Sequence, residues 1–176
     1  MKQTAFRLVC TALLLCTVLL ALPACAADFD ETYLPITDVA LSDIKEGTAW
    51  SDFVNDHAGE AFVYIPNHAF FRVKDGQSVM VIAEHTAQGN TIQKIFAYER
   101  TTLASKSEFM ALTNGISIQE VIEKVGLPVS DNPYLSSAHV LYFPVSNGQI
   151  CSMRISTADY TLQSFEFLDS LSSMPG

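Results

Sequence analysis

Residues 115–128 read GISIQEVIEKVGLP, and residues 47–60 read GTAWSDFVNDHAGE. Both stretches begin at a Gly, carry large apolar side chains three residues apart, and reach a second Gly near their end. The apolar pairs are Ile118 and Val121 in the later stretch and Trp50 and Phe53 in the earlier one. Apolar residues at spacings of three and four are typical of an amphipathic helix. The sequence therefore predicts the same helix twice, at an offset of 68 positions.

The likeness extends on both sides of these two stretches. Leu41 and Ile44 precede the first as Phe109 and Leu112 precede the second, which predicts a short helix over 38–45 and another over 105–113. After the helices the apolar spacing changes to two, which is typical of strands. Each half also has a hairpin signal, Asp-Gly in Val73–Gln77 and Asn-Gly in Val145–Gln149, and these dipeptides suit a type I′ turn.

We therefore predict an α+β fold of two tandem repeats, 36–104 and 105–176, each a helix-loop-helix packed on one face of an antiparallel β-sheet. Ser117 with Glu120 resembles a capping box at the start of the later helix, and Gly126 before Leu127-Pro128 ends it.

The second half carries the pattern G-[IM]-[ST]-x-x-[EQ]-V-x-x-x-[VL]-G-x-P, from Gly115 to Pro128. This pattern resembles the signature of the SmpA/OmlA small bacterial lipoproteins, and the tandem layout is similar to that of the β-lactamase-inhibitory-protein-like (BLIP-like) family. The first half departs from the pattern, with Ala49 in place of Ser or Thr and Glu60 in place of Pro. The resemblance implies an envelope protein that binds other proteins. It also raises Asp75, at a hairpin tip, as a contact residue, although Asp before Gly also suits the turn itself.

The first 25 residues have the composition of an export signal, with Lys2 and Arg7 ahead of the apolar run LVCTALLLCTVLLAL. The four residues Leu22–Cys25, LPAC, resemble a lipobox, which predicts lipidation at Cys25 and attachment to the cell-envelope membrane surface. Cleavage after Ala26, giving a freely secreted protein, is the alternative. Residues 26–35 are expected to form a tether, and an added edge strand is their other interpretation.

The net charge, the cysteines and the absence of known motifs limit which partners and activities are expected. The formal net charge is −9, and loss of the basic leader makes the mature chain more acidic, which argues against nucleic acid and anionic lipid. Of four Cys, only Cys151 lies beyond the leader and the proposed anchor, so no internal disulfide is expected. No catalytic or metal-binding motif is present, and we expect no enzyme activity, no cofactor and no metal.

Strand alternation predicts which side chains face away from the helices. The pattern places Val79 and Val81 under the helices, so the opposite register should form an open, aromatic and Met-rich face, as protein interfaces favour. Together with Asp75, the expected protein-binding residues are Phe70, Arg72, Met80, Ile82, Phe96, Tyr98, Tyr142 and Arg154.

The function predicted from these observations is binding of another protein, whose identity the sequence does not give, through this open face and without catalysis. A self-associating structural lipoprotein, as a homodimer, is the alternative. An inhibitor of an extracellular enzyme such as a β-lactamase is a narrower hypothesis, since one fold serves many binding tasks.

Overall fold

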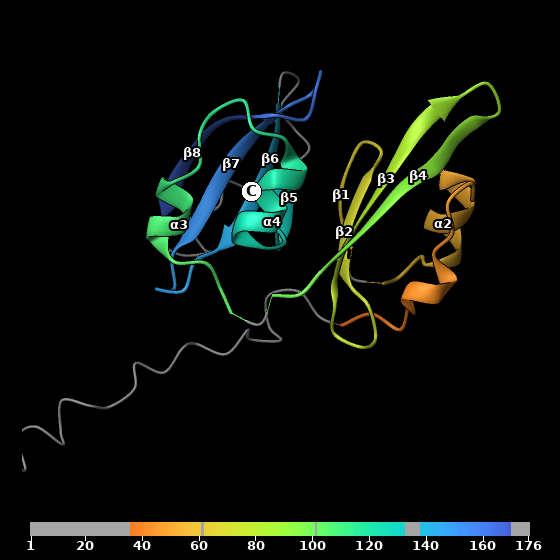
Figure 1. Cartoon of the computed structure of the whole chain (residues 1–176), viewed down its shortest axis with the longest axis horizontal. Helices are drawn as coiled ribbons and strands as arrows, with labels where there is room; N and C mark the ends of the chain where they lie inside the picture. Colours follow the sequence, from red (N-terminus) through yellow and green to blue (C-terminus); the bar gives the residue numbers. More distant parts are fainter. Residues whose placement is uncertain (1–35, 61, 101, 133–137, 170–176) are drawn as a thin grey trace, which may run out of the picture.

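The computed structural model describes residues 36–60, 62–100, 102–132 and 138–169 (Figure 1). A first unit runs from 36 to 100 and a second from 102 to 169, and each has short helical segments followed by four strands. The helical segments are the 3₁₀ turn η1 (Leu41–Asp43), α2 (Trp50–Asp56), α3 (Lys106–Met110) and α4 (Ile118–Val125). The strands are β1 (Val63–Ile65), β2 (His68–Arg72), β3 (Ser78–Thr86), β4 (Gly89–Tyr98), β5 (Ser130–Asn132), β6 (Ala138–Pro144), β7 (Ile150–Ser156) and β8 (Leu162–Leu168).

Each unit contains one four-stranded antiparallel sheet whose strands pair in chain order, β1-β2-β3-β4 and β5-β6-β7-β8. In both sheets the pairing of the third strand with the fourth shifts by one residue, between Ile82 and Ala83 and between Arg154 and Ile155. The extra residue lies on the fourth strand, at Gln93 in β4 and at Gln163 in β8. A bulge bends the strand that carries it and increases the local twist.

The predicted helix-loop-helix repeat on one face of a sheet is wrong. The described part of the chain is mainly antiparallel sheet, and its α-helices span only five to eight residues. The expected helix over 38–45 is the single 3₁₀ turn η1. Two local features differ from α3, where Ser105 and Glu108 form a capping box: Ala40, which aligns with Glu108, cannot complete such a box, and Thr37, which aligns with Ser105, is bonded to the sheet. The Thr37 N–H and hydroxyl donate to the Arg72 carbonyl and the Lys74 N–H donates to the Val39 carbonyl, so these residues are extended along β2 and only a single turn follows.

The two expected hairpin turns are present, with a different geometry. In the first, the Gly76 N–H donates to the Val73 carbonyl and the Val73 N–H donates to Gln77, and the second turn repeats both bonds at Val145, Gly148 and Gln149. Among the turn residues only the two glycines have positive φ, 86° and 84°. A type I′ turn needs positive φ at two residues, so these are type I turns closed by a glycine bulge.

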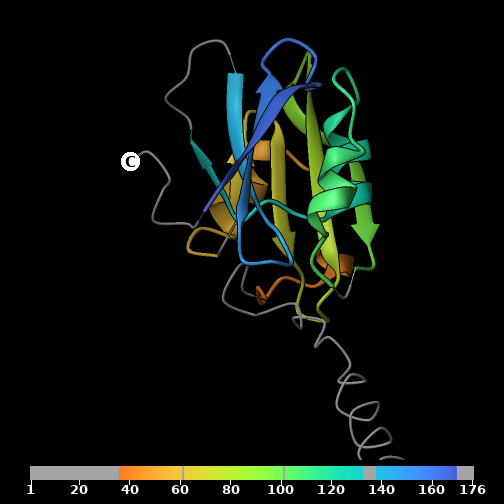
Figure 2. The same ribbon diagram turned by 90° about the vertical axis from the view of Figure 1, so that its left-hand side faces the viewer.

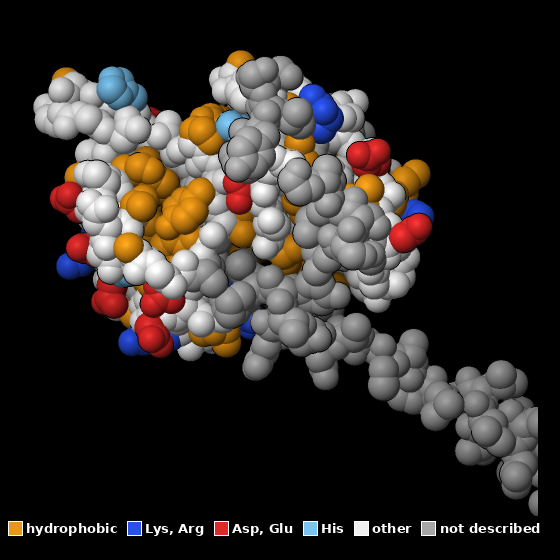
Figure 3. All heavy atoms as spheres, turned by 180° about the vertical axis from the view of Figure 1, so that it is seen from behind, with side chains coloured by type: hydrophobic (Ala, Val, Ile, Leu, Met, Phe, Trp, Pro, Cys, Tyr) orange, Lys and Arg blue, Asp and Glu red, His pale blue; other side chains and the backbone are white. Residues whose placement is uncertain are grey.

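Two core clusters account for the layers of the molecule. The first lies between α2 and one face of the first sheet, and includes Phe53, Phe71, Val79 and Val81. At its edge the half-buried rings of Trp50, Phe62 and Tyr64 contact one another. Figure 3 shows hydrophobic side chains gathered on this first unit, in the left half of the view.

The second core cluster fills the space between the two units. It joins Phe70 and Met80 of the first sheet to Ile122 of α4 and to Leu141 and Met153 of the second sheet. Helix α4 therefore lies between two sheets, while α2 covers the outer side of the first sheet (Figure 1). Figure 2, viewed from the second sheet, shows its blue strands in front of the yellow-green strands of the first.

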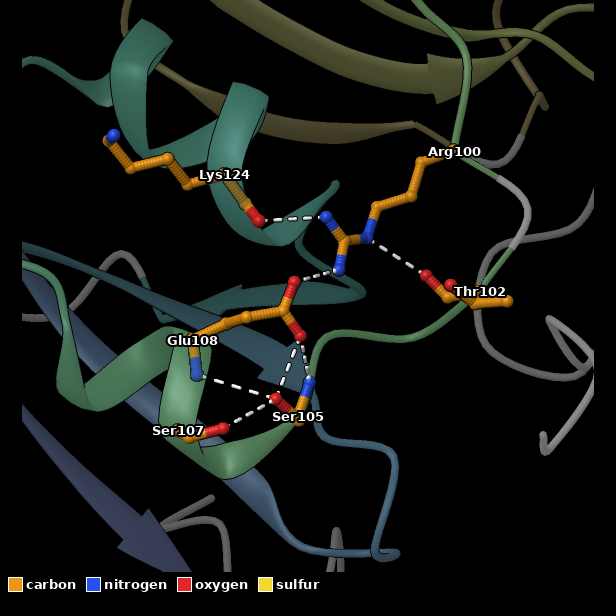
Figure 4. A network of polar contacts seen from close by, with 6 residues as sticks. All are labelled: Arg100, Thr102, Ser105, Ser107, Glu108 and Lys124. Atoms are coloured by element: carbon orange, nitrogen blue, oxygen red, sulfur yellow. Dashed lines mark hydrogen bonds and ion pairs between the residues drawn. The ribbon is translucent and has the colours of Figure 1, made fainter. Parts of the chain in front are cut away.

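A polar network around Arg100 ties the end of the first unit to the second (Figure 4). Its guanidinium donates to the Lys124 carbonyl at 2.7 Å and to the Thr102 carbonyl at 2.8 Å, and pairs with Glu108 at 2.9 Å. The backbone N–H of Ser105 and the Arg100 side chain hold the pKa of Glu108 at about 2. One arginine thus contacts the end of α4 and the capping box of α3.

The predicted leader (1–25), its lipidated Cys25 and the tether (26–35) lie outside the described residues. Within the described part of the chain, the helices are too short and too polar to cross a membrane.

Candidate functional site: a groove between the two units

The face expected to be open is an internal interface. Phe70 and Met80 are fully buried, and Ile82, Phe96 and Tyr98 pack against the same cluster as α4. This face is buried because α4 presents apolar side chains to both sheets. The second unit therefore covers the apolar face of the first sheet that points away from α2. The expected partner surface is thus occupied within the chain itself.

The remaining predicted contact residues do not form one surface. Tyr142 is buried in a small cluster of the second sheet, whereas Arg154 on β7 is exposed. Asp75 is exposed at the hairpin tip and accepts a hydrogen bond from the Gln77 N–H at 3.3 Å, which is the turn role described above. Arg72 is half-buried at the end of β2, where its carbonyl accepts a bond from Thr37.

A groove of about 340 Å³ opens where the units meet, at the end of β3 that carries residues 82–85. This volume is in the range of small-ligand sites. The groove walls come from both units, and they are lined by Asn67, His68, Ile82, Ala83, Glu84, His85, Ser117, Ile118, Gln119, Asp159 and Tyr160. The first six belong to the β1–β2 turn and to β2 and β3, and the others to the start of α4 and the β7–β8 turn.

His68 is the buried polar group of this groove, with 4% of its surface exposed. Its Nδ1 lies 3.1 Å from the Pro66 carbonyl oxygen, which can only accept, so Nδ1 carries the proton. Burial lowers the pKa of His68, and the ring is neutral near pH 7. The other nitrogen, Nε2, is consequently an acceptor, and it has no hydrogen-bond partner among the described residues.

A chain of side-chain hydrogen bonds orients the Asn67 amide. His85 Nδ1 donates to the Asn90 Oδ1 at 2.9 Å, and the Asn90 Nδ2 donates to the Asn67 Oδ1 at 2.9 Å. The carbonyl oxygen of the Asn67 side chain is therefore used, and its NH₂ group remains as a donor. The groove thus offers one acceptor, on His68, and one donor, on Asn67, from consecutive residues.

Tyr160 forms the opposite wall in a conformation that non-glycine residues seldom adopt, with φ of 55°. Its carbonyl accepts the Ile118 N–H at 2.9 Å, which holds the β7–β8 turn to the start of α4. Its ring lies 4.3 Å from that of His68 and is parallel to that of His139 at 6.2 Å. Backbone strain of this kind is concentrated at functional sites, because the surroundings must hold it in place.

The charges on the groove walls are negative. Glu84 comes from β3 and Asp159 from the β7–β8 turn, both are exposed, and no Lys or Arg lines the groove. Hydrogen bonds from the side chains of Ser156 and Thr161 hold the pKa of Asp159 below its ordinary value, so that this carboxylate stays charged. The arrangement suits binding of a polar or cationic group.

The Ser117 hydroxyl is used in the capping box of α4, and within the described ranges no three His, Cys, Asp or Glu side chains gather closely enough to hold a metal ion. Cys151 is buried, and burial raises the pKa of its thiol to about 12, which leaves it protonated and unreactive at neutral pH.

Of the predicted contact residues only Ile82 lines this groove. His68, Asn67 and Tyr160 were not among the residues predicted from the sequence. The dipeptide Pro66-Asn67 is a turn signal that could have marked one wall. Nothing in the sequence around Tyr160 indicates that its ring meets a histidine from the other unit. That contact follows from how the two sheets pack.

No family model and no curated protein matches this chain.

Proposed function

We propose that this chain is an exported, lipid-anchored cell-envelope protein that binds another protein without catalysis, and that the groove between its units is the binding site. The function is the one predicted from the sequence, but the proposed binding site is a different one. The face first expected to bind a partner protein is buried between the two units. The observation that carries the proposal is the buried His68, which lines the groove and whose Nε2 has no hydrogen-bond partner among the described residues.

Three further features support binding at this position. The groove combines an apolar floor, at Ile82 and Ile118, with a few oriented polar groups, which is the usual composition of ligand sites. Its walls come from two packed units, and sites often form at such junctions. The resemblance of Gly115–Pro128 to the SmpA/OmlA lipoproteins is consistent with an envelope role, as is the lipobox-like Leu22–Cys25.

Site-specific photo-crosslinking tests the binding site. A photoreactive amino acid at Gln119, on the groove wall, is expected to capture a partner in the native envelope, and the same group at exposed Glu46, outside the groove, is expected not to. A bulky Gln119→Trp variant should reduce co-purification of the captured protein at least tenfold, with Gln88→Trp, at an exposed site outside the groove, as its control. Identical products from both crosslinking positions, or none from either, would contradict the proposal.

Membrane attachment is tested separately. The Cys25→Ser variant is expected to leave the membrane fraction, because two or more acyl chains are needed for stable anchoring. A variant that remains in that fraction would exclude the lipid anchor and leave the groove proposal unaffected.

A further inference from the structure

The ligand class of the groove follows from the charges on its walls. Glu84 and Asp159 belong to different units and line the same groove, and no Lys or Arg lines it with them. Exposed carboxylates alone do not define a site, since most are solvated. Here they flank a buried imidazole, so the groove offers three hydrogen-bond acceptors and no cation of its own.

His68 supplies the independent observation. Its ring is almost fully buried, its proton is on Nδ1 facing Pro66, and the unpaired Nε2 can only accept. Nε2 is not among the fully buried unpaired atoms of the described residues, so water can reach it through the groove, and a donor group can take the place of that water. A ligand that donates a hydrogen bond to Nε2 would satisfy it, and a neutral imidazole receives an ammonium or guanidinium group well.

The apolar part of the groove fits the rest of a basic side chain. Ile82 and Ile118 line the groove and can cover the aliphatic stem of such a side chain. The NH₂ group of Asn67 is a donor beside these acceptors and requires a carbonyl oxygen. A polypeptide carries both a cationic side chain and backbone carbonyls, whereas a simple amine or metal ion does not.

We propose that the groove binds a Lys or Arg side chain in a basic segment of the partner protein. This inference rests on the proposed function, since it specifies the chemistry of that same groove. The net charge of −9 would also attract a basic partner from a distance and make association weaken as salt is added.

The test uses short peptides, because the partner is not identified. Tetralysine and tetraarginine, acetylated and amidated at their ends, are titrated into the purified protein, with tetraglutamine and tetraglutamate as controls. Both basic peptides are expected to bind and to shift the ring signals of His68 and Tyr160 in nuclear magnetic resonance spectra. Equal binding of tetraglutamine, or shifts confined to residues outside the groove, would overturn the inference.

A charge-matched pair of variants separates the groove from the general acidity of the chain. Glu84→Gln with Asp159→Asn should weaken binding of tetralysine about tenfold, since each exposed charge pair contributes only modestly. The control, Asp43→Asn with Glu46→Gln, removes two exposed charges elsewhere in the first unit and should leave binding within about twofold. An equal loss in both double variants would show non-specific attraction and overturn the inference.

His68→Gln provides a second measurement, with thermal unfolding as a check that the protein is folded. The amide can still donate at one end and accept at the other, so tetralysine binding should be partly kept, whereas His68→Phe should weaken it more strongly. Capture of a partner at Gln119 without any binding of basic peptides would remove the ligand class and leave the proposed function standing. Failure of both experiments would remove both.

Discussion

Helices α2 and α4 occupy equivalent positions in the two units but lie in opposite surroundings. Helix α4 has a complete capping box and four buried residues, and it lies between two sheets. Helix α2 has no side-chain cap and one buried residue, Phe53, and it covers one sheet from the outside. Similar apolar spacing in two sequence stretches therefore gave one central and one peripheral helix.

The difference shows what an apolar strand face indicates and what it does not. The second face of the first sheet is apolar because α4 covers it, and the same composition would serve a separate partner. Within one chain, the tandem arrangement puts the neighbouring unit closest to that face. The surface left for other molecules is the junction, where the packing of the two units leaves the groove.

The largest effect on stability is expected from shortening one side chain on each helix, at the aligned positions Ile122 and Val54. Ile122 is 1% exposed between the two sheets, whereas Val54 is half-buried on α2. Ile122→Ala is expected to lower the free energy of unfolding by about 3–4 kcal/mol, and Val54→Ala by about 1 kcal/mol. Urea denaturation measures both, and a similar slope in the two variants ensures a common unfolded state. Equal losses would contradict the central position of α4.

The sequence was informative where local chemistry decides the structure. The capping box of Ser117 and Glu120, the two hairpin positions, and the burial of Val79 and Val81 beneath α2 were all predicted and are confirmed. These features depend on a few neighbouring residues or on strand alternation, which one sequence displays.

Features that depend on contacts between the units could not be predicted in the same way. Burial of Met80 depends on α4, which is far away in the chain, and alternation shows only that Met80 and Val79 face opposite sides. The groove has the same origin, because His68 and Tyr160 meet through packing of the units. The missing helix near 38–45 is different: Ala40 at the position of Glu108 was a local warning in the sequence itself.

The second prediction concerns the junction network, for which the first unit has no counterpart at Ala40. The pKa of Glu108 falls from 4.5 to about 2 on folding, so its charged form stabilises the protein above pH 4.5, and the gain is lost as the pH falls toward 2. Since the carboxylate is 46% exposed, screening limits the effect to about 1 kcal/mol.

Glu108→Gln should therefore lower the free energy of unfolding by about this amount at pH 7, and the variant and the parent should converge near pH 2. Glu46→Gln, at an exposed site with no partner side chain among the described residues, is the control and should show no such difference. A gap between Glu108→Gln and the parent that is constant across this pH range would exclude the ion pair as its cause.

An effect of similar size is expected from removing the α4 cap. In Ser117→Ala the Glu120 N–H loses its side-chain acceptor, and the loss should be about 1 kcal/mol in the free energy of unfolding. Ser117→Thr keeps the hydroxyl and is the matched control, expected within about 0.5 kcal/mol of the parent. If alanine and threonine were equivalent, the cap would contribute nothing and the contrast with α2 would rest on burial alone.

The smallest effect is the reverse change on α2, at the aligned position. Ala49 already has extended N-cap dihedrals, φ −61° and ψ 133°, close to the −68° and 155° of Ser117, so a serine there needs no rearrangement of the backbone. Ala49→Ser should raise the free energy of unfolding by about 0.5 kcal/mol, because its hydroxyl can accept the Asp52 N–H. Adding Asp52→Glu completes the capping box and should increase the gain, whereas Asp52→Glu alone should have little effect. If the double variant were no more stable than the parent, the missing cap would not limit the stability of α2, and its packing against a single sheet would.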